Sequence, residues 1–115
     1  MKEVFEVGLD IIKKIQETQS EKLEQTGHLM AQAFMEGHKF FVSGSGHSHT
    51  MAEEMYARAG GFAFVVPILT SELTMTEHPT KSSNIERLSG YAKILVDLYG
   101  VSCGDVRFDC IQFWA

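Results

Sequence analysis

Most of the chemistry that this sequence offers lies in one loop, SGSGHSHT, which runs from Ser43 to Thr50 after a short apolar stretch. Gly44 and Gly46 permit backbone angles and close approaches that other residues forbid. A helix that starts near residue 49 would present free N–H groups and a partial positive charge to the loop. With the serine hydroxyls as further donors, the pattern favours a phosphate or another compact anion. The residues expected to bind it are Ser43, Gly44, Ser45, Gly46, His47 and Ser48.

Two familiar phosphate motifs do not describe this loop. A nucleotide-binding P-loop needs a lysine after its glycines, and none follows them here. The dinucleotide pattern G-x-G-x-x-G is incomplete, because His49 stands at its third glycine position. From the pattern alone, a tight strand-to-helix turn with a serine cap and no ligand explains the loop about equally well.

The histidines suggest other chemistry. His47 and His49 could ligate a metal ion together with His78, but a His-x-His pair without a carboxylate is not a full ligand set. The sequence therefore predicts no metal site and no cofactor. His78 is a candidate general base, because histidine titrates near neutrality. A loop histidine without a catalytic role explains His78 at least as well.

The segments that must position the loop alternate between helix and strand. Apolar residues recur at helical spacing over residues 3–17, and Thr18 with Glu21 forms a capping-box pattern for a second helix that ends at Gly37. KFFVSG before the loop and FAFVVPIL at 62–69 have the composition of strands. The latter is apolar throughout, which is typical of a strand covered on both faces.

Two further helices are predicted, at residues 49–59 and 83–100, and residues 70–82 between them are polar enough to be a loop. DVRFDCIQFW at the C-terminus is a poor strand candidate, because its charges and its tryptophan do not alternate cleanly. The order predicts an α/β fold with parallel strands. In such sheets ligands bind beyond the carboxyl ends of the strands, where the loop lies.

The bulk composition narrows the class of protein. The 115 residues suffice for a single domain, predicted here to cover 1–115. The net charge of -5 and the scattered basic residues argue against nucleic acid as a partner. No run of about eighteen apolar residues is present, so no membrane partner is predicted. Cys103 and Cys110 fit no metal or redox spacing, which favours reduced thiols in the cytoplasm.

Two stretches resemble the SIS (sugar isomerase) domain family, whose members bind phosphosugars. FFVSGSGHSHTMAEE, at residues 40–54, is similar to the first strand, loop and helix of that domain. EHPTKSSNIERLSGYAKILVDLYGV, at residues 77–101, is similar to the corresponding stretch of an uncharacterised bacterial subgroup. The resemblance covers roughly residues 1–106.

The resemblance implies a three-layer α/β/α sandwich around a five-stranded parallel sheet in flavodoxin-like order, preceded here by two N-terminal helices. It places Ser48 at the sugar phosphate and a second phosphate-binding loop after the third strand. Family members are aldose–ketose isomerases, related phosphosugar enzymes or sensor domains, and many form dimers. The expected partners are therefore a sugar phosphate or a similar small anion, and a second copy of this chain.

One departure from the family concerns catalysis. Some SIS isomerases carry a catalytic glutamate about ten residues beyond the phosphate-binding serine, where this chain has Arg58. Glu54, earlier in the same helix, and His78 are the remaining candidates for proton transfer. Two hypotheses stay open: a phosphosugar isomerase, or a non-catalytic carbohydrate-binding module, which includes a degenerate protein with only a structural or oligomeric role.

The C-terminus departs further from the family. After Val106 the family continues with an apolar strand and an S-N-S-G or S-T-S-G loop, whereas this chain reads RFDCIQFWA. Codons for residues 107–115, read one base later, permit Val-Leu-Ile, then Val or Ala, then Ser-Asn-Ser-Gly. A frameshift is therefore expected to have left the N-terminal half of the domain, impaired in function, with an out-of-family tail at 107–115. Sequencing the locus tests this, since downstream DNA without SIS-like sequence would exclude it.

Overall fold

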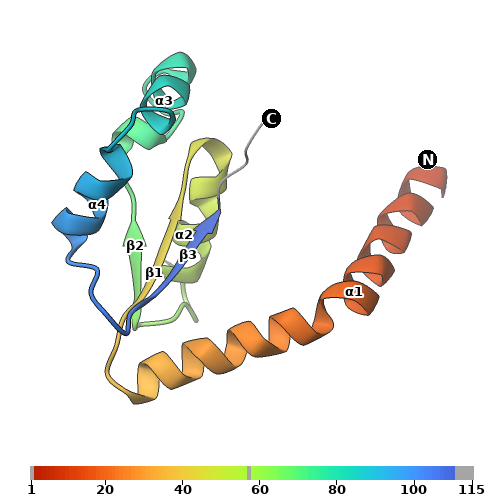
Figure 1. The fold of residues 1–115 in the computed structure, drawn as a ribbon. Coiled ribbons are helices and arrows are strands. Elements are labelled where there is room, and N and C mark those ends of the chain that lie inside the picture. Colours follow the sequence, from red (N-terminus) through yellow and green to blue (C-terminus); the bar gives the residue numbers. More distant parts are fainter. Residues whose placement is uncertain (1, 57, 111–115) are drawn as a thin grey trace. The chain divides into compact units, whose positions relative to one another are not determined.

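The computed structural model describes residues 2–56 and 58–110, whose elements are drawn in Figure 1. The chain divides into two compact units, residues 1–32 and residues 33–115. Most of helix α1 (Lys2–Met35) belongs to the first unit, and the second contains the sheet and the other helices. None of the helices described combines the length and the apolarity that crossing a bilayer requires.

Helix α1 is one continuous helix, so the prediction of two N-terminal helices is wrong. The Thr18 hydroxyl, which was expected to cap a second helix, instead donates to the Lys14 carbonyl at 2.7 Å inside the same helix. The Ser20 hydroxyl donates to the Gln16 carbonyl in the same way. Residues 9–26 contain no glycine or proline, so the helical ladder has no reason to stop there.

The second unit is built on a parallel sheet with the strand order β2-β1-β3. Strand β1 (Phe40–Gly44) lies in the centre and pairs with β2 (Val65–Ile68) on one side and β3 (Val106–Cys110) on the other. This order matches the first three strands of a flavodoxin-like sheet. The two strands predicted around the loop, and their parallel pairing, are confirmed.

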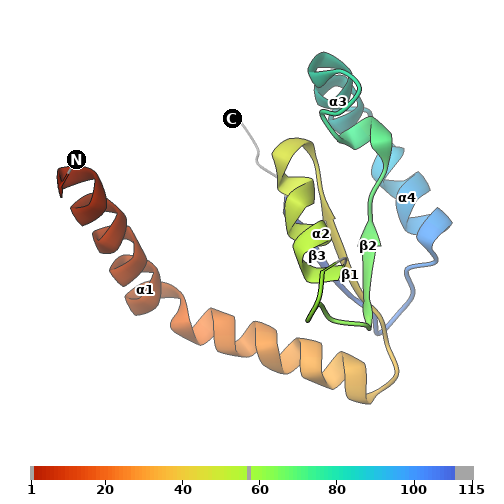
Figure 2. The same ribbon diagram turned by 180° about the vertical axis from the view of Figure 1, so that it is seen from behind.

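Helix α2 (His49–Tyr56) covers one face of the sheet, and Figure 2 shows it in front of the strands. Its Ala52 is fully buried. The aromatic run before β2 packs in the same unit: the Phe64 ring centroid lies 5.0 Å from that of Phe34 and 6.4 Å from that of Phe40. Phe64 therefore helps to fill the core from just outside the strand.

Helix α4 (Tyr91–Tyr99) covers the opposite face of the sheet. Its Leu95 forms a buried cluster with Phe41 of β1 and Ile68 of β2, and Phe41 is completely excluded from solvent. The Tyr99 hydroxyl fastens the helix further by donating to the Leu69 carbonyl at 3.2 Å. The described residues thus form the predicted helix–sheet–helix layers.

Residues 70–100 differ from the predicted loop followed by one helix. A short 3₁₀ turn, η2 (Ser71–Leu73), and helix α3 (Pro79–Glu86) occupy the segment, and α4 follows only after Gly90. Pro79 does not exclude a helix, because it stands in the first turn, where a missing N–H costs little. Gly90 has a φ of 87° and interrupts the single helix that the apolar spacing predicted.

Strand β3 forms even though its sequence was a poor strand candidate. In its described residues the alternation is regular: Val106, Phe108 and Cys110 share one face, and Arg107 and Asp109 share the other. Charges on an edge strand of this kind are common. The remainder of the expected out-of-family tail, residues 111–115, lies outside the described residues.

The Asp105 carboxylate joins the start of β3 to the start of β1. It accepts hydrogen bonds from the Lys39 N–H at 2.8 Å, from the Ser102 N–H at 2.8 Å and from the Ser102 hydroxyl at 2.9 Å. The bond from the Lys39 N–H, and next that from the Ser102 N–H, hold the pKa of Asp105 below its ordinary value.

We expect Asp105→Asn to lower the urea midpoint of unfolding, because an amide cannot replace a carboxylate that only accepts hydrogen bonds. The folded pKa is depressed, so the carboxylate stabilises the fold above its unfolded pKa of about 3.9 and loses that effect as the pH falls below it. The gap between variant and wild type should therefore be full at neutral pH and shrink near about pH 3. A gap of equal size at both pH values, or an equal effect of Asp97→Asn as the exposed control, would contradict this role.

Candidate functional site

The predicted anion-binding loop lies at the carboxyl end of β1. The strand ends at Gly44, and a single 3₁₀ turn, η1 (Gly46–Ser48), leads into α2. The Ser48 N–H donates to the Ser45 carbonyl at 3.0 Å and closes this turn. The first amides of such a turn have no partner in the helical ladder, so they are suited to an anion.

The two glycines of the loop serve different purposes. A Cβ on Gly44 would lie 2.4 Å from the Ser48 carbonyl oxygen and 2.9 Å from the His49 nitrogen, so only glycine lets the turn approach the strand. Gly46 has a φ of 55°, in the region that disfavours side chains, and a Cβ there would lie 4.0 Å from Met75 Sδ. The predicted need for glycine at both positions is therefore explained by close approach at one and by conformation at the other.

Several side chains of the loop are engaged within it. His49 Nδ1 is hydrogen-bonded to the Gly46 carbonyl oxygen, and its Nε2 lies 3.4 Å from Glu53 Oε1. The Thr50 hydroxyl donates to the His47 carbonyl at 2.9 Å. These contacts hold the first turn of α2 against the loop, whereas the His47 side chain is exposed.

The histidines considered as metal ligands do not form such a site in the part of the chain that the structure describes. No three His, Cys, Asp or Glu side chains gather there closely enough to hold a metal ion.

A pocket of about 170 Å³ opens beside the first half of the loop. Three of the predicted phosphate-binding residues line it: Ser43, Gly44 and Ser45. Its apolar wall comes mainly from β2, α4 and the chain before α4, and includes Ile68, Leu88 and Leu95. The turn η1 lies next to this pocket along the chain but supplies none of the described residues that line it.

Arg107 and Asp109 of β3 form a polar end of the pocket. The Ser43 hydroxyl donates to Asp109 Oδ1, and Arg107 Nε lies 2.6 Å from Asp109 Oδ2. Sequence reasoning missed both residues, because it assigned 107–115 to an out-of-family tail. The available signal was the alternation within β3, which places Arg107 and Asp109 beside Phe41 and Ser43 once the parallel register is known.

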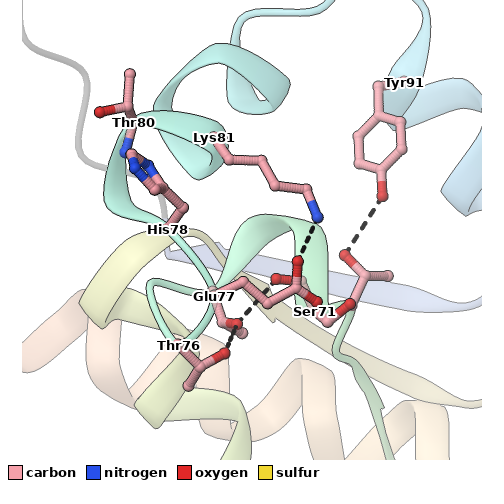
Figure 3. Close-up of polar contacts among 9 residues, drawn as sticks. Ser71, Thr76, Glu77, His78, Thr80, Lys81 and Tyr91 are labelled. Carbon is pink, nitrogen blue, oxygen red and sulfur yellow. Dashed lines mark hydrogen bonds and ion pairs between the residues drawn. The ribbon is translucent and has the colours of Figure 1, made fainter.

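The two candidate catalytic residues are not among the described residues that line the pocket. Glu54 is exposed on α2 and forms an ion pair with Arg58. His78 is exposed and caps helix α3, with its Nδ1 accepting the Thr80 N–H at 3.3 Å (Figure 3). The structure therefore brings neither side chain to the pocket.

A polar network orders the chain between η2 and α3 (Figure 3). The hydrogen bond from Lys81, and then that from Ser71, lowers the pKa of Glu77, and the same Glu77 contact raises the pKa of Lys81. The Tyr91 hydroxyl donates to Thr70 Oγ1 at 3.4 Å and links α4 to this segment. Helix α3 also contacts η1, so the network helps to hold α3 against the loop.

A parallel α/β unit with a glycine–serine turn and a pocket at its carboxyl edge belongs to the class of doubly wound ligand-binding domains. Within that class the assignment is specific: the sequence model of the SIS domain matches residues 5–108. The chain therefore belongs to the SIS-domain family, as the resemblance predicted.

Curated relatives agree with this assignment. The chain is similar to a UPF0309 protein of Halalkalibacterium halodurans, at 46% identity over 96 residues, which cover 84% of this chain and 40% of that protein. UPF0309 proteins of Brucella ovis and Brucella canis are each 40% identical to it over 85 residues, or 74% of this chain and 35% of each relative. The matched region thus spans well under half the length of these relatives.

Proposed function

We propose that this chain is a phosphosugar-binding domain in which the loop Ser43–Ser48 holds the phosphate. The observation that carries the proposal is the turn at the carboxyl end of β1, which borders a pocket in a chain of the SIS family. Ligands of parallel α/β sheets bind at such edges. The net charge of the whole chain is negative, so local donors rather than a general positive field must attract the anion.

The donors of this site are backbone amides first and hydroxyls second. The opening amides of η1 and the positive end of α2 favour an anion. Ser48 is half-buried at the end of η1, which suits a hydroxyl that contacts the phosphate. Ser43 is expected to contribute less, because its hydroxyl already donates to Asp109.

We expect Ser48→Ala to weaken sugar-phosphate binding by about 1.5–3 kcal/mol, the range for a hydrogen bond to a charged group. Isothermal calorimetry with pentose and hexose phosphates measures this loss. Ser83→Ala is the matched control, since the Ser83 hydroxyl lies on α3 and donates to the Pro79 carbonyl at 3.3 Å. If the two variants bound sugar phosphates with equal affinity, Ser48 would not be a phosphate-binding residue.

We propose that the chain binds a sugar phosphate without isomerising it through Glu54 or His78. Aldose–ketose isomerisation needs a base within reach of the sugar carbons. The sequence candidates Glu54 and His78 are engaged elsewhere and are not among the described residues that line the pocket. An isomerisation assay on any sugar phosphate that binds separates the two activities: turnover that Glu54→Gln or His78→Gln abolishes would establish the isomerase.

We also propose self-association. A single amphipathic helix cannot bury its own apolar stripe, and residues 2–32 consist of one helix. Two-fold dimers are the commonest assemblies, and a specific interface buries more than about 1,000 Å². We expect light scattering at low micromolar concentration to give the mass of a dimer, and Ile12→Glu with Ile15→Glu to give the 12.9 kDa monomer. A wild-type chain that is already monomeric would exclude the dimer.

A cytoplasmic location is proposed on the basis of the cysteines. Cys103 and Cys110 are both free thiols, and Cys103 is exposed, which suits a reducing compartment. Fractionation of cells that express the tagged chain tests this, and recovery outside the cytoplasm would contradict it.

A further inference from the structure

The lining of the pocket as a whole carries more negative than positive charge. It includes the carboxylates of Glu86 and Asp109 and one guanidinium, that of Arg107. Arg107 is already paired with Asp109, at 2.6 Å between Nε and Oδ2. A phosphate dianion inside the pocket would therefore meet like charge from two carboxylates, and the pocket would disfavour it.

Asp109 is held in one orientation by contacts on both of its oxygens. Ser43 donates to Oδ1 from the central strand, and Arg107 contacts Oδ2 from the same strand β3. A carboxylate has about four acceptor positions, so further hydrogen bonds remain open to it, and a guanidinium has five N–H donors. A fixed carboxylate beside a fixed guanidinium offers adjacent acceptors and donors, which is what neighbouring hydroxyl groups need.

Another part of the pocket lining is apolar. Leu88, Leu95 and Ile68 line it together with Tyr91, whose hydroxyl is bonded to Thr70. A sugar ring has hydroxyl groups at its edge and C–H groups on its faces, so it suits a pocket whose lining combines a few polar groups with apolar side chains. The volume of about 170 Å³ is smaller than the ~300–1,000 Å³ of complete ligand sites, so the pocket suits part of a ligand.

We propose that the pocket takes the uncharged sugar portion of the ligand, with its hydroxyls on Asp109 and Arg107, while the phosphate stays outside it at Gly46–Ser48. This division rests on the proposed phosphosugar function and makes Asp109 a specificity-determining residue. It assigns a use to two β3 residues that sequence reasoning did not place in the candidate site.

The test compares the affinities for inorganic phosphate and for pentose and hexose phosphates, measured by calorimetry on the whole chain. In the wild type, at least one sugar phosphate should bind about tenfold or more tightly than inorganic phosphate. Asp109→Asn should lower the affinity for that sugar phosphate about tenfold, because one hydrogen bond to a charged group is lost. The affinity for inorganic phosphate should stay unchanged or rise. Asp97→Asn, which alters an exposed carboxylate paired with Lys93 on α4, is the control.

A second variant tests the inference independently of any folding defect that Asp109→Asn causes. Ala92 is exposed and lines the pocket, so Ala92→Phe should fill the pocket while the carboxylate of Asp109 stays in the sequence. It should lower the affinity for the sugar phosphate about tenfold and leave the affinity for inorganic phosphate unchanged. The inference is overturned if the wild type binds inorganic phosphate and sugar phosphates equally, or if both variants change the two affinities by the same factor. A wild type that binds neither probe defeats the proposed function itself, and the inference with it.

Discussion

Phe41→Ala is expected to lower the free energy of unfolding by about 3–5 kcal/mol, the range for removal of a buried phenylalanine ring. Phe41 is completely buried at the centre of β1 and packs against Leu95 of α4 and Ile68 of β2. A cavity there would detach α4 from the sheet and disturb the pocket. Because domains of this size have only about 5–15 kcal/mol of stability, most of the fold's margin would be lost.

Urea unfolding followed by circular dichroism measures this effect. Phe62→Ala is the matched control. The Phe62 side chain is 51% exposed, so its removal should lower the free energy of unfolding much less. If the two variants unfolded at the same urea concentration, the cluster around Phe41 would not be the core of the unit.

The second large effect is expected from Gly44→Ala. The added Cβ would lie 2.4 Å from the Ser48 carbonyl oxygen and 2.5 Å from its carbon, and backbone atoms cannot move aside as a side-chain tip can. We expect the turn to shift, the free energy of unfolding to fall by about 1–3 kcal/mol and sugar-phosphate binding to be lost.

Gly27→Ala separates this crowding from a general effect of replacing glycine. Gly27 lies within α1, and a Cβ there meets no heavy atom within 4 Å. It should be neutral or stabilise the chain by up to about 1 kcal/mol, as alanine does within helices. Binding that survives Gly44→Ala would show that the close approach of strand and turn does not form the site.

The centre of the fold could be predicted from local sequence. KFFVSG and the following loop carry an apolar run, two glycines and a helix start in immediate succession, and the structure has β1, η1 and α2 there. The apolar run at 62–69 likewise predicted a second strand parallel to β1, although only Val65–Ile68 is in the strand. These features depend on short segments, and local chemistry decides them.

Two kinds of feature could not be predicted: those for which one side chain has alternative hydrogen-bond partners, and those that depend on pairing between strands distant in the sequence. Thr18 fits a capping-box pattern, which predicts the start of a new helix. Its hydroxyl instead donates to the Lys14 carbonyl one turn earlier, within the continuous helix α1. The polar composition of residues 70–82 predicts a loop, but Pro79 begins α3.

The polar end of the pocket shows the same limit at the site. Arg107 and Asp109 reach it only because β3 pairs with β1 in one register, across more than sixty residues of sequence. A shift by one residue would turn both side chains to the other face.

The central claim is that the loop Ser43–Ser48 binds the phosphate of a sugar phosphate. The most direct measurement is an NMR titration of the ¹⁵N-labelled chain with pentose and hexose phosphates, in which each amide reports on its own surroundings. We expect the amide signals of Gly46, His47 and Ser48 to shift together and to saturate with one dissociation constant, while that of Gly27 stays unchanged. Loop signals that remain unmoved by every sugar phosphate, or that drift without saturation alongside Gly27, would contradict the claim.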